Sequence, residues 1–183
     1  GNTVDVCPVG ALTSKDFRFK IRVWFLKETT SVCPGCARGC NINIHHHNGH
    51  VYRLKPRQND AVNETWICDE GRFGYKAIND NRVLYPQIQQ DGRLQQASWP
   101  AALAHAIEAI RVHEGMAVGI VVAPQGTNED SYLLARLASE VLRAPRVVLY
   151  PGVPGYEDDF LIRADKNPNT RGAQDMGLPA PAT

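Results

Sequence analysis

Four cysteines in one short window constrain this chain more than any other feature of its sequence. They fall within 36 of the 183 residues, and three of them share one loop sequence, Cys-Pro-Gly-Cys-Ala-Arg-Gly-Cys. The four are Cys33, Cys36, Cys40 and Cys68. A fifth cysteine, Cys7, makes the total odd, and the sequence shows no secretory signal segment. This combination argues against a disulfide framework and in favour of a metal site.

The spacing of the four cysteines favours a [4Fe–4S] cluster. Three ligands from one loop and a fourth from a distant element can surround a cubane, because the loop wraps three iron corners and its glycines let backbone N–H groups approach the sulfurs. Between Cys40 and Cys68 lie 27 residues. A structural zinc site more often uses two separated Cys-x-x-Cys pairs. Zinc therefore remains the alternative to iron–sulfur at these four residues.

Cys7 stands apart from the other four and is followed directly by Pro8. A Cys-Pro pair ends the bacterial ferredoxin motif, in which the last cysteine ligates a cluster whose other ligands lie elsewhere. We therefore predict that Cys7 is the last ligand of a second [4Fe–4S] cluster whose other ligands lie upstream. On this prediction the chain is cut at its start, and an ordinary buried thiol is the alternative.

Charge and hydropathy exclude two broad classes of function. The chain has 20 Lys and Arg against 19 Asp and Glu, a net charge of +1. Such a balance gives no general attraction to nucleic acid or to an anionic membrane. No apolar run approaches the roughly 20 residues that a membrane-spanning helix needs. We expect a chain that binds no nucleic acid and makes no direct membrane span.

The first part of the chain has a strand-like pattern. Apolar and basic residues alternate from Phe17 to Phe25, which predicts a half-buried strand. Segments 41–47 and 50–55 flank Asn48-Gly49, a strong signal for a two-residue hairpin turn. The second part begins at Ser98 and alternates helices and strands instead.

In that second part, Ser98 is predicted to cap a helix, and segment 117–123 has the continuous apolar character of a buried parallel strand. Asn128 or Asp130 is predicted to cap the next helix, which is followed by a strand at 146–150. Strand, helix and strand in this order form a right-handed βαβ unit. Five apolar side chains of its helix are expected inside: Leu133, Leu134, Leu137, Val141 and Leu142.

Three other features have a structural and a functional interpretation. The histidines at 45–47 and His50 suit a solvated hairpin tip better than a zinc or nickel site. Segment 126–129 lies where α/β sheets bind ligands, but a helix cap explains it as well. Arg72, close to Cys68, is hypothesised to raise the potential of the cluster there by its positive charge.

Several segments together resemble a known family in their order along the chain: 5–12, 17–19, 31–36 and 68–75. They resemble the large iron–sulfur subunit of bacterial respiratory complex I, the NADH–quinone oxidoreductase. Segments 126–129 and 158–165 resemble the molybdopterin-oxidoreductase-like part of that protein. The cysteine motifs in this resemblance are specific, whereas the later segments are less so.

The resemblance implies an α+β and α/β architecture for an electron-transfer chain. A small β-rich [4Fe–4S] domain would be followed by an incomplete molybdopterin-oxidoreductase-like α/β domain. Residues 1–22 would end an upstream ferredoxin-like module, residues 23–80 would form the [4Fe–4S] domain, and residues 81–183 would begin the α/β domain. Cys7 would close a cluster on the main path from flavin to quinone. The four-cysteine cluster would lie off that path.

Membership of such a complex would also imply partners and a location. The partners would be the other peripheral-arm subunits, namely the flavin- and NADH-binding subunit and a ferredoxin-like subunit. The complex would face the cytoplasm at the bacterial inner membrane. The chain would not be catalytic alone, because enzyme activity, including translocation, belongs to the complex.

The main alternative that the resemblance leaves open is the molybdenum- or tungsten-dependent formate dehydrogenase family, which has the same cysteine spacing. There a lysine typically follows the last cysteine by two positions and connects cluster to pterin. Here that position is Glu70. No cysteine remains for a molybdenum ligand, since all five are already assigned. We therefore expect no molybdopterin.

Overall fold

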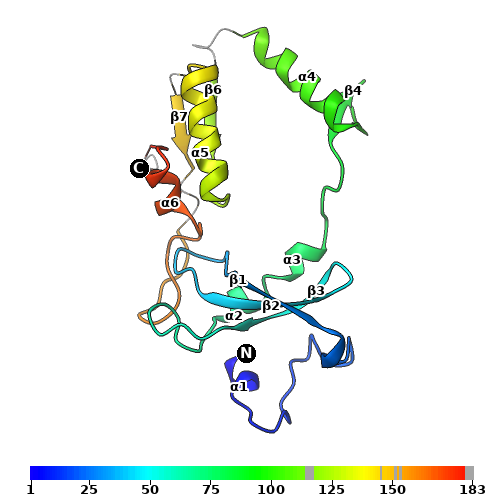
Figure 1. The fold of residues 1–183 in the computed structure, drawn as a ribbon, viewed down its shortest axis with the longest axis vertical. Coiled ribbons are helices and arrows are strands. Elements are labelled where there is room, and N and C mark those ends of the chain that lie inside the picture. The colour runs from blue at the N-terminus through cyan, green and yellow to red at the C-terminus, as the bar shows by residue number, and fades with distance from the viewer. Residues whose placement is uncertain (114–117, 145, 151, 153, 180–183) are drawn as a thin grey trace. The chain divides into compact units, whose positions relative to one another are not determined.

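The computed structural model describes residues 1–113, 118–144, 146–150, 152 and 154–179. The chain divides into two compact units, each described by itself below (Figure 1). The described residues of the first unit lie within Gly1–Asp80, Ala123–Gln125 and Pro151–Thr170. Those of the second lie within Asn81–Val122, Gly126–Tyr150 and Arg171–Thr183.

A three-stranded antiparallel sheet forms the centre of the first unit (Figure 1). Its strands lie in chain order, β1 (Lys27–Val32), β2 (Asn41–His47) and β3 (His50–Pro56). Asn48 and Gly49 join β2 to β3 with φ angles of 47° and 76°. A type I′ turn requires positive φ at both central residues, which asparagine and glycine adopt most readily. The predicted hairpin is confirmed.

The described residues of the first unit also form four short helices: α1 (Asn2–Asp5), η1 (Val23–Phe25), α2 (Asp69–Phe73) and α3 (Lys76–Asn79). Asn79 attaches the end of α3 to β3, because its side chain accepts a hydrogen bond from the Val51 amide and donates one to the Val51 carbonyl. The core beneath the sheet contains two of the cysteines. Its buried members are Cys33, Cys40, Ile42, Leu54, Ile67, Tyr75 and Leu161.

The predicted strand at residues 17–25 is wrong. These residues form turns and then η1, and among the described residues they pair with no strand. Phe17 alone is buried, while Phe19 is 90% exposed with a φ of 64°. The guanidinium of Arg18 lies 4.6 Å from the centre of the Phe19 ring. Neighbouring side chains of a strand point to opposite faces, so this contact requires a turn.

The second unit contains two small sheets. β4 (Gln87–Gln90) and β5 (Arg93–Gln96) form an antiparallel hairpin, while β6 (Gly119–Val122) and β7 (Arg146–Leu149) pair in parallel. Its helices among the described residues are α4 (Trp99–Arg111), α5 (Asn128–Arg136), the π-helix η3 (Leu137–Val141) and, towards the end, α6 (Thr170–Asp175). The order β6, α5, β7 confirms the predicted βαβ unit, although Ala117 of the predicted strand lies outside the described residues.

The structure differs from the predicted helices in two details, the residue that caps α5 and the side chains that α5 and η3 bury. Thr127, and not Asn128 or Asp130, caps α5: its hydroxyl accepts from the Asp130 amide at 3.2 Å, and the Asp130 carboxylate accepts from the Thr127 amide at 3.0 Å. Of the five apolar residues predicted inside, Leu134 packs against the core of the unit and Leu142 is half-buried, whereas Leu133, Leu137 and Val141 are exposed. Ser98 caps α4 as predicted.

The described ranges contain no helix that is both long enough and apolar enough to cross a membrane.

Candidate metal centre

The four clustered cysteines line one small cavity in the first unit. Three glycines and Glu70 complete its lining among the described residues. Cys33 directly follows β1 and Cys40 directly precedes β2, so the three-cysteine loop connects two paired strands. The sheet therefore holds both ends of this loop, and the fourth thiol is supplied by Cys68 at the start of α2. The structure brings together the residues that the spacing selected.

Backbone hydrogen bonds fix the shape of the three-cysteine loop. The Cys33 amide donates to the Cys40 carbonyl at 2.8 Å, which closes the loop at its base. Gly39 has a φ of 67°, a left-handed conformation in which a residue with a Cβ is strained. Glycine at this position therefore lets the loop turn back before its last cysteine.

The fourth thiol is positioned by a helix N-terminus. Cys68 is the N-cap of α2, and its Sγ accepts a hydrogen bond from the Gly71 amide at 3.3 Å. A Cβ on Gly71 would lie 2.8 Å from the Sγ of Cys33. The absence of a side chain at Gly71 therefore lets α2 approach the loop closely enough for both sulfurs to line the same cavity.

Electrostatics in this cavity disfavours free thiolates. Burial and the nearby Cys36 and Cys68 thiolates raise the pKa of Cys33, against a smaller opposing effect of the Gly35 amide. Burial and then the nearby Cys33, Cys36 and Cys68 thiolates raise the pKa of Cys40 to about 11, against a smaller opposing effect of Arg38. Thiolates are the form that binds metal, and a bound cation removes their mutual repulsion. The donor set is therefore suited to a positively charged metal group.

A zinc ion and a [4Fe–4S] group require different spacings of four thiols. A tetrahedral zinc site with Zn–S bonds of about 2.3 Å places its sulfurs only about 3.8 Å apart. A [4Fe–4S] group instead binds one thiolate at each of its iron corners, so its four sulfurs lie farther apart. Among the described residues, no group of three or more His, Cys, Asp or Glu side chains is arranged as a ligand set for a single metal ion.

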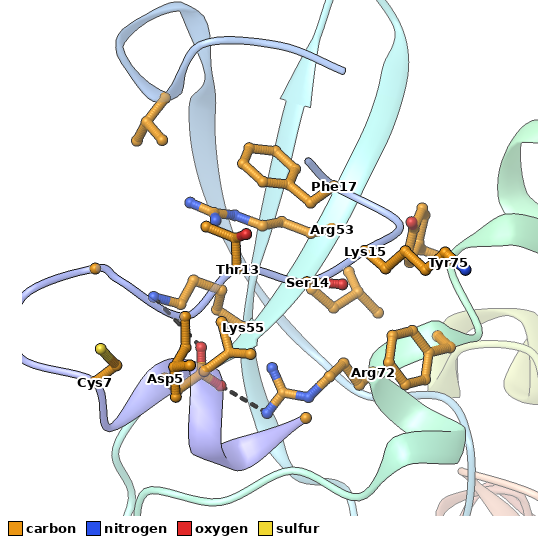
Figure 2. Close-up of a pocket in the computed structure, with 17 residues that line it drawn as sticks. Asp5, Cys7, Thr13, Ser14, Lys15, Phe17, Arg53, Lys55, Arg72 and Tyr75 are labelled. Atoms are coloured by element: carbon orange, nitrogen blue, oxygen red, sulfur yellow. Dashed lines mark ion pairs between the residues drawn. The ribbon is translucent and has the colours of Figure 1, made fainter. Parts of the chain in front are cut away.

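Cys7 does not line this cavity. It lies in the N-terminal segment and borders a separate cavity of about 530 Å³, which Lys55 and Arg72 also line (Figure 2). Hydrogen bonds from backbone amides, chiefly those of Leu12 and Val9, lower the pKa of Cys7. Cys7 therefore lies apart from the other four cysteines, and its pKa is lowered whereas those of Cys33 and Cys40 are raised.

This difference predicts the order of thiol alkylation in the reduced, metal-free protein. At about pH 7.5, iodoacetamide should modify Cys7 first and Cys40 last, because only the thiolate reacts and the pKa values of these two thiols are shifted in opposite directions. Peptide mass spectrometry over time measures the rates. We expect a difference of at least about tenfold. Equal rates at Cys7 and Cys40 would contradict the prediction.

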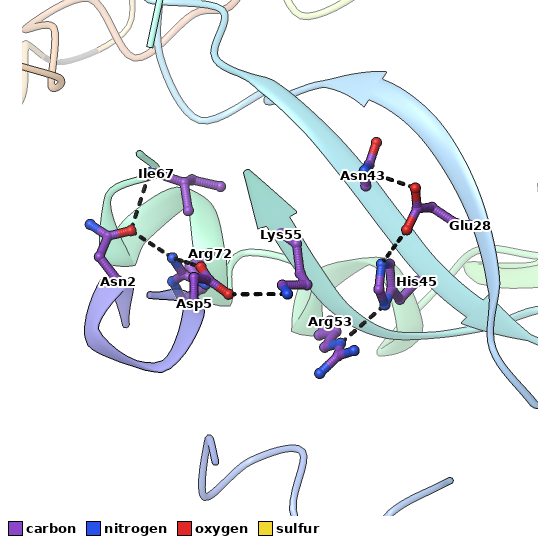
Figure 3. Close-up of polar contacts among 9 residues, drawn as sticks. All are labelled: Asn2, Asp5, Glu28, Asn43, His45, Arg53, Lys55, Ile67 and Arg72. Carbon is purple, nitrogen blue, oxygen red and sulfur yellow. Dashed lines mark hydrogen bonds and ion pairs between the residues drawn. The ribbon is translucent and has the colours of Figure 1, made fainter. Parts of the chain in front are cut away.

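Arg72 attaches the N-terminal segment to α2. Its Nη2 lies 2.6 Å from Asp5 Oδ2 and donates to Asn2 Oδ1 at 2.7 Å, and Lys55 lies 3.5 Å from the same aspartate (Figure 3). The Asn2 oxygen also accepts from the Ile67 amide at 3.4 Å. Arg72 is buried and its guanidinium is held in this ion pair; it does not line the four-cysteine cavity, and its effect on the potential of the cluster stays a prediction.

His45 belongs to a partly buried polar network within the sheet. Arg53 Nε donates to His45 Nδ1 at 3.1 Å, so the imidazole proton resides on Nε2, which donates to Glu28 Oε2 at 2.9 Å (Figure 3). The other histidines have separate partners: His46 Nε2 lies 3.0 Å from the Thr29 hydroxyl, and His47 Nδ1 donates to the Phe25 carbonyl at 2.8 Å.

The His45 network predicts a loss of stability in mild acid. Burial and the nearby Arg53 lower the pKa of His45 below its usual 6.5. The unfolded chain then binds a proton more readily, so this contribution to stability is complete above pH 6.5 and is lost as the pH falls through the lower folded value. Denaturant unfolding should give a smaller free energy at about pH 5.5 than at pH 7.5, and His45→Gln should reduce the difference. Equal values in the native protein would contradict this prediction.

Glu70 lines the four-cysteine cavity and is paired with a distant residue. Its Oε2 lies 3.0 Å from Lys166 Nζ. Sequence reasoning singled out Glu70 but missed Lys166, because 96 positions separate them. Sequence reasoning missed Gly71 as well. The local signal for it was a glycine three positions after Cys68, the cysteine that caps α2. Segment 126–129, the other candidate site, contains the Thr127 cap of α5.

Comparison with known proteins agrees with this geometry. Residues 26–80 match the molybdopterin oxidoreductase Fe4S4 domain. The chain is 37% identical over 147 residues to NADH-quinone oxidoreductase subunit 3 of Thermus thermophilus, which covers 80% of this chain and 19% of the relative. It is 39% identical over 164 residues to the G subunit of the NADH-quinone oxidoreductase of Streptomyces coelicolor, covering 88% and 19%.

A third relative, the second G subunit of the NADH-quinone oxidoreductase of Rhizobium meliloti, is 38% identical over 148 residues, covering 80% of this chain and 17% of the relative. The chain thus spans about a fifth of the length of the curated relatives it matches. The family match includes all four cysteines of the cavity. The chain is therefore similar to part of the G subunit of NADH-quinone oxidoreductase, and its residues 26–80 match the molybdopterin oxidoreductase Fe4S4 domain.

Proposed function

We propose that the chain is an electron-transfer segment of an NADH–quinone oxidoreductase and holds a [4Fe–4S] cluster on Cys33, Cys36, Cys40 and Cys68. The observation that carries the proposal is the convergence of these four thiols on one cavity within the Fe4S4 domain. Zinc and formate dehydrogenase are both less favoured. The family match over these four cysteines is an Fe4S4 domain, and the relatives are subunits of the NADH-quinone enzyme.

The bound cluster would supply one-electron exchange without proton transfer. The chain's own residues would hold it and control its surroundings. Three of the ligands are buried, which keeps water away from their sulfurs. The Gly71 amide donates to Cys68 Sγ and stabilises negative charge there. These contacts favour a rigid site with little reorganisation when an electron enters or leaves.

Cys7 is proposed as the last ligand of a second [4Fe–4S] cluster whose other ligands lie upstream. Its place outside the four-cysteine cavity and the backbone amides directed at its sulfur support this role. We also propose the division into residues 1–22, 23–80 and 81–183, respectively the end of a ferredoxin-like module, the [4Fe–4S] domain and the start of an α/β domain.

The names of the relatives support membership of complex I. The proposed partners are its flavin- and NADH-binding subunit and its ferredoxin-like subunit, and the proposed location is the cytoplasmic face of the bacterial inner membrane. We further propose that the chain binds no molybdopterin. The pairing of Glu70 with Lys166 supports this, because the position beside the cluster carries a carboxylate occupied by an ion pair.

Metal and sulfide analysis of anaerobically prepared protein tests the proposal. About four iron and four sulfide per chain, with brown absorbance that dithionite bleaches, are expected for the chain of 183 residues. One zinc per chain without colour would instead assign the cysteines to a structural site. Molybdenum near one per chain in the intact subunit would contradict the proposed absence of molybdopterin.

A further inference from the structure

A segment from late in the sequence packs against the cysteine loop of the first unit. We call residues 155–167 the return segment. The Ala37 amide, within the cysteine loop, donates to the Asp165 carbonyl at 2.8 Å. Leu161 is 6% exposed and belongs to the same buried cluster as Cys33 and Cys40. One backbone contact and one core contact therefore join this segment to the site.

The return segment is also held by its own hydrogen bonds. The Asp158 carboxylate accepts from the amides of Phe160, Leu161 and Ile162 at 3.0, 2.6 and 2.7 Å. The Gly155 amide donates to the Ala164 carbonyl at 2.8 Å, which closes the segment into a loop. The hydrogen bonds of Asp158 and the contact between Gly155 and Ala164 therefore fix the backbone that precedes Lys166.

Lys166 extends from this loop to the wall of the four-cysteine cavity. Its Nζ lies 3.0 Å from Glu70 Oε2 and donates to the Tyr156 carbonyl at 3.1 Å, and its side chain is only 27% exposed. A Cβ at Gly155 would collide with the aliphatic part of this lysine. Glycine at 155 thus leaves room for the lysine, and two oxygen partners orient the ammonium group.

Glu70 is the one charged residue other than cysteine among the described residues that line this cavity. It adds a negative charge to a site that already contains four potential thiolates. Another cation of the loop, Arg38, donates to the Val62 carbonyl at 2.7 Å. Lys166 is the cation that contacts Glu70 directly.

We propose that the Glu70–Lys166 pair sets the reduction potential of the cluster held by the four cysteines, with Lys166 as a positioning residue that offsets the Glu70 carboxylate. This inference rests on the proposed function. Reduction adds one negative charge to the cluster. A nearby carboxylate opposes that charge and a nearby ammonium favours it, and the Glu70 side chain is 58% exposed, so solvent screens part of both effects. The ion pair therefore holds the potential between the values that either charge alone would produce.

Redox titration of the full-length protein, followed by electron paramagnetic resonance, tests this inference. The signal of this cluster is the one lost in Cys68→Ala, or in Cys36→Ala if the first variant does not accumulate. Lys166→Met should lower its midpoint potential and Glu70→Gln should raise it. The double variant should return close to the native value. A partly exposed ion pair contributes at most about 1 kcal/mol to stability, so these variants should fold.

At a fixed ambient potential near the midpoint, each single substitution should change the ratio of oxidised to reduced cluster at least threefold, or about 28 mV for a one-electron couple. Arg163→Met is the matched control, because Arg163 belongs to the same segment and pairs with Glu157 away from the cavity. A purely structural role would move both single variants in the same direction. That result, or unchanged potentials, overturns this inference, whereas a native protein without a [4Fe–4S] signal overturns the proposed function itself.

Discussion

Alanine in place of Cys33 is expected to reduce the iron content of the 183-residue chain from about four atoms to background, with loss of the visible absorbance. Cys33 provides one of the four thiols and also belongs to the buried core. Its removal leaves one iron corner without a protein ligand and opens the site to water. Iron and sulfide analysis of anaerobically purified variants, together with circular dichroism, measures the effect.

Cys7→Ala is the matched control for that experiment. Cys7 lies outside the four-cysteine cavity, so the variant should keep its four iron atoms in the chain of 183 residues. In the longer native protein, the same substitution should remove the signal of the second cluster alone. Full iron content in Cys33→Ala would show that the ligand assignment is wrong. Loss of iron in both variants would show that global misfolding had produced the result.

Gly71→Ala is expected to lose the cluster although no ligand is changed. Two opposing effects decide the outcome. Alanine favours a helix over glycine by about 1 kcal/mol. The new methyl group, however, would lie 2.8 Å from Cys33 Sγ and near the buried Ile67 side chain. Overpacking of this kind costs about 1–3 kcal/mol and displaces the side chains involved. We expect the displacement of Cys33 to dominate, and iron content to fall by more than half.

Gly119→Ala serves as the control for the added methyl group. Its Cβ would lie 3.9 Å from the Arg146 carbonyl oxygen, an ordinary contact, so iron content should remain at the native level. The thermal unfolding midpoint of each variant, measured after removal of iron, separates packing from metal binding. If Gly71→Ala retains full iron content, the close approach of α2 to the cysteine loop is not required for the site.

The features that depend only on residues close together in the sequence, such as the hairpin and the cysteine loop, could be predicted from local signals. Asn48-Gly49 indicated the hairpin, because few other residue pairs adopt two consecutive positive φ angles. The cysteine spacing indicated a shared site, because loop ligands stay close whatever the rest of the fold. The spacing alone left zinc open, and the match of residues 26–80 to an Fe4S4 domain favours the cluster.

The remaining features depend on contacts between distant parts of the chain. The alternation at residues 17–25 resembles a strand, yet a strand forms only where a neighbour accepts its hydrogen bonds, and the described residues provide none. No periodicity links Glu70 to Lys166 or Arg72 to Asp5, because such pairs arise only after the segments have packed. Gly71 was similarly hidden, since its role is defined by a sulfur atom from another loop.

The chain order of the first unit has a consequence for biosynthesis. The first unit is discontinuous in sequence and resumes after residues of the second unit, so Lys166 is translated 98 residues after Cys68. At typical rates of about 5–20 residues per second, the ribosome needs roughly 5 to 20 seconds to cover that distance. During this interval all four thiols have been synthesised while the return segment has not. A nascent chain therefore contains its four cavity cysteines for several seconds before the segment that packs against their loop has been made.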